Sequence, residues 1–157
     1  MNIRIFALGL ALPLAALVLS SVAPPVSMPA LAARQKMHKV VIHVDENNPK
    51  KMNLALNNVK NLRKLYDSRG EKIIIEVVTY GPGLHMLRAD TSPVRDRIER
   101  MATEYDDLQF SACANTRRVM KKKSGREVPL LPEATVVPSG VARIMELQEQ
   151  GYAYVRP

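Results

Sequence analysis

The sequence predicts an α/β protein with three layers, α/β/α, in which helices cover both faces of a five-stranded, mostly parallel sheet. Short runs rich in β-branched residues alternate along the chain with segments whose apolar residues recur at helical spacing. One of these runs, residues 73–78, is apolar at nearly every position, as in strands buried on both faces of a parallel sheet. Four strand–helix pairs followed by a fifth strand are typical of this fold class.

The first strand is predicted over residues 39–44, and a long helix follows it. Asn48 is suited to cap this helix, and Pro49 fits its first position, where a missing N–H costs nothing. Its apolar stripe consists of Met52, Ala55, Leu56, Val59, Leu62 and Tyr66. Gly70 lies just beyond the expected end of the helix.

The second strand, residues 73–78, contains one charged residue, Glu76. The sequence leaves open whether this carboxylate is paired or lies at a rim. Residues 81–83, Gly-Pro-Gly, predict a turn after the strand. Ser92 and Pro93 predict the start of a second helix, because serine is a common N-cap and proline a common first residue.

The third strand, residues 108–112, leads directly into the only cysteine of the chain, Cys113. Asn115 and Thr116 offer side chains of the kind that cap a helix, so the cysteine is expected where a strand ends and a helix begins. Helix N-termini carry a partial positive charge, and Arg117 and Arg118 follow within one turn. Both features would lower the pKa of a thiol.

The last part of the chain predicts a fourth strand at 135–137, a helix capped by Ser139, and an edge strand at 152–155. In a parallel sheet the loops after the strands gather at one edge, where ligands bind. This places His85 in the neighbourhood of Cys113, either as a proton acceptor or as a surface histidine without a role. His43, inside the first strand, is more typical of a core histidine than of a ligand.

No cofactor is expected. A metal site built from His43, Asp45, His85 and Cys113 has no recognised ligand spacing behind it. The chain also lacks the glycine-rich phosphate loops, the nucleophile elbow of hydrolases and the zinc-binding His-Glu-x-x-His pattern.

Residues 1–32 are predicted to be a secretory signal peptide. Arg4 gives a basic start, residues 5–23 are apolar and uncharged, and Ala-Leu-Ala before position 33 suits signal peptidase. An uncleaved membrane anchor is the alternative, because the apolar run approaches spanning length. Pro13 and the small-x-small site favour cleavage after Ala32. We therefore expect a periplasmic or secreted protein with a single domain over residues 33–157, which contacts the membrane only if the leader is retained.

The chain has a formal net charge of +8, which raises the question of nucleic acid binding. Export and the scarcity of aromatic residues argue against it, so no nucleic acid partner is expected. A single cysteine in an exported chain forms no internal disulfide. The thiol is then shielded, paired with another chain, or kept reactive for use.

Four segments carry a resemblance to a known family. The single cysteine directly after the third strand, within residues 108–118, is the most specific of them. The others are residues 54–62, 135–141 and 147–154. Together they resemble the DsrE/DsrF/TusD-like family of small α/β sulfur-relay proteins, its secreted members in particular, over nearly all of the chain after the leader.

This resemblance implies a parallel five-stranded sheet with flavodoxin-like layering and a homo-oligomer, commonly a trimer or hexamer. It also implies that Cys113 carries sulfur as a persulfide. The expected partners are sulfur donor and acceptor proteins or small sulfane-sulfur species. The best-understood relay members are cytoplasmic, whereas this chain is predicted to be exported, where their usual donor and acceptor proteins are absent. The resemblance therefore bears on the fold and the cysteine more than on the pathway.

Two functional hypotheses follow. In the first, the chain is an exported sulfur carrier or sulfurtransferase-like protein with Cys113 as the nucleophile, supported by His85, Asn115, Arg117 and Arg118. In the second, it is a non-catalytic oligomeric binding or scaffold module, and the cysteine is a buried packing residue.

Overall fold

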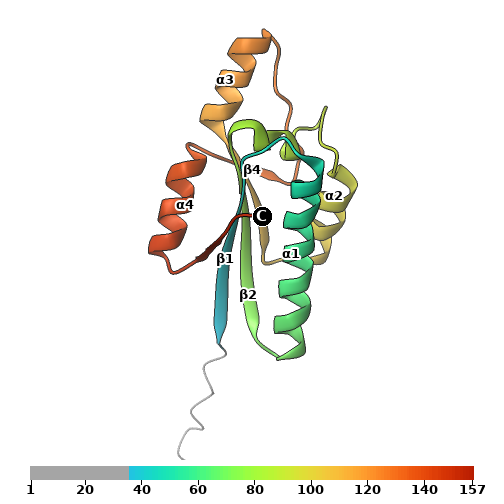
Figure 1. Cartoon of the computed structure of the whole chain (residues 1–157), viewed down its shortest axis with the longest axis vertical. Helices are drawn as coiled ribbons and strands as arrows, with labels where there is room; N and C mark the ends of the chain where they lie inside the picture. The colour runs from blue at the N-terminus through green and yellow to red at the C-terminus, as the bar shows by residue number, and fades with distance from the viewer. Residues whose placement is uncertain (1–35) are drawn as a thin grey trace, which may run out of the picture. The chain divides into compact units, whose positions relative to one another are not determined.

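The structure, a computed structural model, describes residues 36–157; the leader predicted at 1–32 lies outside them. The elements in chain order are β1 (Met37–Val44), α1 (Pro49–Ser68), β2 (Lys72–Thr79), the 3₁₀ helix η1 (Gly81–Leu87), α2 (Arg95–Glu104), β3 (Leu108–Cys113), α3 (Ala114–Ser124), β4 (Ala134–Val137), α4 (Gly140–Glu149) and β5 (Ala153–Val155) (Figure 1). No helix in this part of the chain is both long and apolar enough to cross a membrane.

The five strands form one sheet in the order β4-β3-β2-β1-β5, and each neighbouring pair is parallel. The predicted three-layer α/β/α architecture is confirmed, and the sheet is parallel throughout rather than mostly parallel. The last strand lies at an edge, as predicted, and pairs with β1 through three residues. All the carboxyl ends of the strands therefore meet at one edge of the sheet, which is where Cys113 is located.

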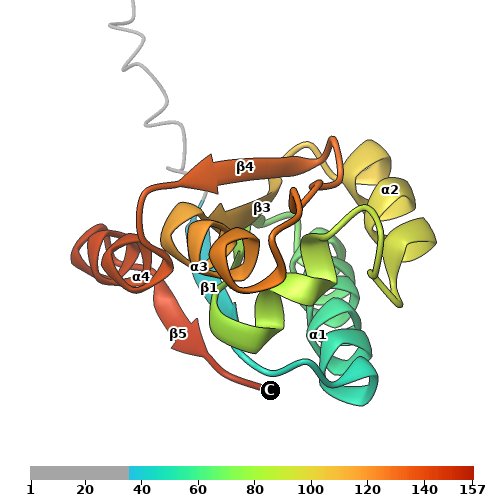
Figure 2. The same cartoon turned by 90° about the horizontal axis from the view of Figure 1, so that it is seen from above.

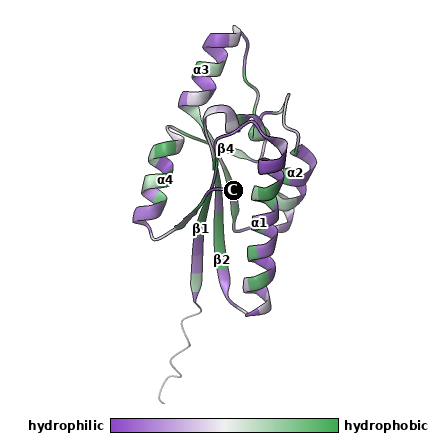
Figure 3. Ribbon diagram, viewed as in Figure 1, coloured by the Kyte–Doolittle hydropathy of each residue, from purple (hydrophilic) through white to green (hydrophobic). Residues whose placement is uncertain are grey.

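The two faces of the sheet are covered unequally. Helices α1 and α2 lie on one face and α4 lies on the other (Figure 2). The larger core, on the α1 side, includes Ile42, Leu56 and Phe110, whereas the α4 side has a small cluster of Val41, Val78, Ile144 and Leu147. Helix α3 has no buried residue, is mostly hydrophilic, and extends beyond the carboxyl ends of the strands (Figure 3).

Two local predictions were wrong. The second helix begins at Arg95 instead of Pro93, because the Ser92 hydroxyl donates to the Met86 carbonyl at 2.6 Å and closes a turn before the helix. The turn predicted at 81–83 is the first part of η1. A Cβ at Gly83 would lie 2.1 Å from the Val44 carbonyl oxygen, so glycine allows η1 to pack directly against the end of β1.

The structure answers the question about Glu76. Its side chain is 3% exposed and accepts two hydrogen bonds from the Arg143 guanidinium, both at 2.8 Å. The Ser111 hydroxyl donates a third at 2.6 Å. The carboxylate raises the pKa of Arg143, which keeps the guanidinium charged. This buried cluster joins α4 to β2 and β3.

We expect that Arg143→Ala lowers the free energy of unfolding by about 2–4 kcal/mol, because it leaves the Glu76 carboxylate buried without its counter-charge. Denaturant unfolding at neutral pH measures this. The control is Glu146→Ala, which removes the exposed second partner of Arg143 at 3.4 Å and should cost less than about 1 kcal/mol. Equal losses in the two variants would contradict the importance of the buried pair.

Candidate functional site

Cys113 is both the last residue of β3 and the N-cap of α3. Its Sγ accepts the backbone N–H of Thr116 at 3.5 Å, so the thiol occupies the place that a serine or aspartate side chain takes in most helix caps. The position between a strand and a helix is as predicted. The assignment of Asn115 and Thr116 as caps was wrong, because the helix already begins at Ala114.

A second helix N-terminus reaches the same sulfur. Helix α4 begins at Gly140 after the N-cap Ser139, and the Gly140 N–H also acts on the thiol. A Cβ at Gly140 would lie 2.9 Å from the Tyr80 Cβ and 3.3 Å from the Cys113 Cβ. Only a glycine therefore lets α4 start this close to the cysteine. The sequence predicted that the loops after the strands gather at this edge and that Ser139 caps the helix, but it did not identify the contact between Gly140 and the cysteine.

The pKa of Cys113 is lowered by these neighbours. Burial is the largest single influence and raises the pKa, since the side chain is only 4% exposed. It is outweighed by hydrogen bonds from the hydroxyl and N–H of Thr116 and from the N–H groups of Gly140 and Asn115. An inert buried cysteine would instead have a raised pKa.

The other residues proposed to support the cysteine have different neighbours. The Arg117 Nε donates to the Val128 carbonyl at 2.9 Å, and the Arg118 guanidinium donates to the Asn115 side-chain oxygen. Asn115 therefore reaches the thiol through its backbone N–H, while its side chain holds Arg118. The groups that lower the pKa of Cys113 are uncharged N–H and O–H groups, whereas the sequence emphasised the arginines as well.

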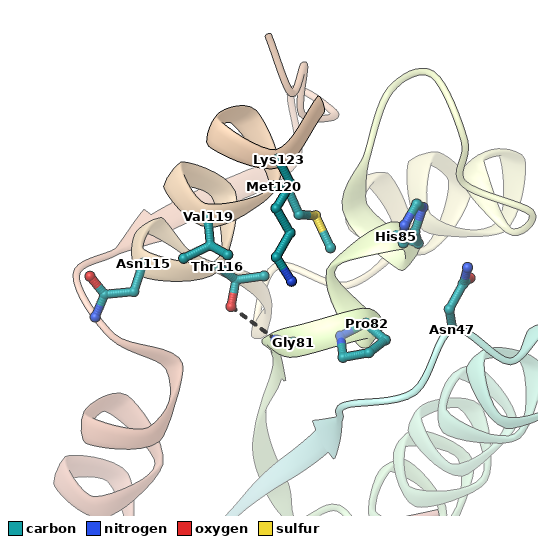
Figure 4. Close-up of a pocket in the computed structure, with 9 residues that line it drawn as sticks. All are labelled: Asn47, Gly81, Pro82, His85, Asn115, Thr116, Val119, Met120 and Lys123. Carbon is teal, nitrogen blue, oxygen red and sulfur yellow. Dashed lines mark hydrogen bonds between the residues drawn. The ribbon is translucent and has the colours of Figure 1, made fainter. Parts of the chain in front are cut away.

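His85 lies on η1 and faces a cavity of about 480 Å³ at this edge of the sheet (Figure 4). Its Nδ1 is hydrogen-bonded to the Thr91 hydroxyl at 2.8 Å, and burial, with Arg88 second, lowers its pKa. The imidazole is therefore neutral at neutral pH. The structure records no hydrogen bond between His85 and Cys113, which is not among the residues lining the cavity. Thr116 connects the two places, because it both lines the cavity and contacts the sulfur.

His43 is a buried core histidine, 4% exposed, as the sequence favoured. Its Nδ1 is hydrogen-bonded to the Tyr154 hydroxyl at 2.7 Å, and its ring stacks on Tyr80 with the centroids 4.5 Å apart. Burial lowers its pKa, which keeps the ring neutral. Within residues 36–157, no three His, Cys, Asp or Glu side chains gather as a metal ion would require.

Comparison with known proteins identifies a family for this chain. A family profile described as the DsrE/DsrF-like family matches residues 30–157, which is most of the chain. The chain belongs to the DsrE/DsrF-like family. Cys113, at the end of β3, lies within the matched region.

One solved structure is similar over almost its whole length. It is described as a protein of unknown function, MTH1491, from Methanobacterium thermoautotrophicum. The two chains are 36% identical, with a TM-score of 0.66, and the match covers 76% of this chain and 99% of that one. No significant match to a curated protein was found.

The hydrogen bonds to Sγ predict a measurable pKa. The rate of alkylation of native Cys113 should rise with pH to a midpoint below about 8.5, the ordinary value for a thiol. Gly140→Ala should raise this midpoint and slow alkylation at neutral pH several-fold, because the added Cβ displaces the first turn of α4.

The control for Gly140→Ala is Val141→Ala, which changes an exposed side chain in the same turn and should leave the pH profile unchanged. A wild-type midpoint at or above 8.5 would mean that the two helix ends do not activate the thiol.

Proposed function

We propose that this DsrE/DsrF-like protein is an exported sulfur carrier or sulfurtransferase-like protein that holds sulfane sulfur on Cys113. The single observation that carries the proposal is the position of Cys113 at two helix N-termini: its Sγ caps α3 by accepting the Thr116 N–H, and Gly140 at the start of α4 lies against it. Helix N-termini stabilise negative charge, which a thiolate and a persulfide share. The leader predicted at residues 1–32 supports a periplasmic or secreted location.

The proposed reaction is sulfur transfer between thiols. The Cys113 thiolate attacks the outer sulfur of a donor persulfide, R–S–SH, and forms a new S–S bond. The donor S–S bond breaks, its electron pair leaves as the thiolate R–S⁻, and the hydrogen stays on the transferred sulfur. The product is Cys113–S–SH, and no oxidant is needed because the number of S–S bonds is unchanged. An acceptor thiolate removes the outer sulfur by the same step.

Each group at the site has a role in this proposal. Thr116 and Gly140 hold the thiolate before attack and the persulfide anion afterwards. His85 stays a candidate proton acceptor, which must act through a molecule in the cavity because the structure gives it no hydrogen bond to the thiol. The partners are sulfur donor and acceptor proteins or small sulfane-sulfur species.

A homo-oligomer, a trimer or hexamer, is part of the proposal. Three large apolar side chains are about half exposed on β4 and α4, close to one another in the chain: Val136, Val141 and Met145. Apolar side chains left in solvent near one another are typical of an interface between protein chains.

The second candidate function is a non-catalytic binding or scaffold module. Burial of Cys113 favours it, because the residue is only 4% exposed and free cysteines often serve as small buried apolar residues. In that case alkylation would be slow in the native protein and fast only in denaturant. Rapid native alkylation would exclude this candidate.

Incubation with a sulfane-sulfur donor should add the mass of one sulfur atom to the wild-type protein, as seen by intact mass spectrometry. Cys113→Ser should gain none, because the serine hydroxyl cannot hold sulfane sulfur. Treatment with a reductant should restore the original mass of the wild type, as expected for a persulfide. Equal addition to both proteins, or none to the wild type, would overturn the carrier proposal.

A further inference from the structure

The cavity beside Cys113 has a mixed lining. Apolar surface comes from Pro82, Val119 and Met120, and polar groups come from Asn47, His85, Asn115, Thr116 and Lys123, with Gly81 in the floor. Its volume of about 480 Å³ falls in the range of sites for small organic molecules. None of the lining residues is acidic. The cavity therefore fits a small molecule with an apolar body and an anionic group.

Lys123 supplies the positive charge. Its side chain extends from α3 toward η1 and the mouth of the cavity (Figure 4). Its neighbour Lys121 is paired with Glu127, but the described part of the chain offers Lys123 no hydrogen bond or ion pair. Asn47 and His85 lie on the other side of the cavity, where the ring nitrogen Nε2 of His85 has no partner among residues 36–157.

Thr116 links this cavity to the reactive sulfur. Its hydroxyl accepts the Gly81 N–H at 2.9 Å on the η1 side, and the same residue donates its own N–H to the Cys113 Sγ. A molecule in the cavity thus rests against the residue that holds the thiol. Cys113 itself is only 4% exposed, so a small, narrow molecule reaches its sulfur more easily than a folded protein does.

We propose that the cavity binds the organic part of a small persulfide, with its carboxylate paired to Lys123 and its apolar body against Val119 and Met120. This inference rests on the proposed sulfur-carrier function and names the donor class for it. The bound persulfide presents its outer sulfur to the Cys113 thiolate. The transfer proceeds as described above, and the organic thiolate R–S⁻ then leaves the cavity.

The test compares three sulfur donors on the full chain, with persulfide formation followed by intact mass. The first donor is the persulfide of para-(mercaptomethyl)benzoate. The second is the persulfide of para-(mercaptomethyl)benzyl alcohol, in which a neutral group replaces the carboxylate. The third is inorganic polysulfide, which has no organic part to bind in the cavity. Lys123→Gln should slow transfer from the benzoate persulfide about two- to fivefold, as expected for one exposed ion pair. It should leave the rates with the other two donors unchanged.

Two further variants complete the design. Lys122→Gln makes the same charge change on α3 outside the cavity. It should change the rates of persulfide formation with the three donors to the same extent. Val119→Trp fills the cavity from a half-exposed position and should slow both organic persulfides while the polysulfide rate stays at the wild-type value. A normal polysulfide rate also shows that this variant is folded.

The outcomes separate the two proposals. If Lys122→Gln and Lys123→Gln act alike, or if Val119→Trp leaves both organic rates unchanged, the cavity proposal fails and the carrier function stands. If no donor, polysulfide included, adds sulfur to wild-type Cys113, the carrier function fails and the cavity proposal fails with it.

Discussion

The buried ion pair between Glu76 and Arg143 is the constraint on which the rest of the site depends. A carboxylate inside a central strand costs several kcal/mol to bury unless a counter-charge and hydrogen bonds compensate it. Arg143 on α4 and Ser111 on β3 provide both. Few apolar side chains join α4 to the sheet, so this polar contact carries much of its placement. Arg143 lies in the first turn of α4, so the ion pair holds this turn, which begins at Gly140, against the sheet.

Cys113 is buried and yet has a lowered pKa, two properties that rarely occur together in a thiol. A buried thiol is normally inert, because a low-dielectric environment disfavours its charged form. Here uncharged donors at the ends of two helices offset that cost without a neighbouring cation. Fixed N–H groups are less affected by salt than surface charges are, and they cannot leave the site as a flexible arginine side chain can. A site of this kind keeps an anionic sulfur species protected from solvent.

Two different regions of the carboxyl edge of the sheet lie on either side of Cys113. On one side, the His43 ring stacks on Tyr80 and is hydrogen-bonded to the Tyr154 hydroxyl. On the η1 side, α3 extends away from the sheet and leaves a cavity between itself and η1. Thr116 contacts both the sulfur and the cavity, so an occupant of the cavity and the thiol share one wall. This division explains why His85, although at the same edge, faces the cavity.

The sequence alone determined the order along the chain of the strands and the four α-helices, a mostly parallel sheet and the placement of Cys113 at a strand end. These features depend on local periodicity and on residues adjacent in the chain. It also led to the family. Only the tertiary structure decided the partner of Glu76, the approach of Gly140 to the thiol, and the separation of His85 from Cys113. Each of these joins segments far apart in the sequence, such as β2 with α4, and the distance between such segments depends on how the helices pack on the sheet. The sequence also missed a local feature, the capping of α3 by Cys113, because a thiol is a weak acceptor and is rarely expected to cap a helix.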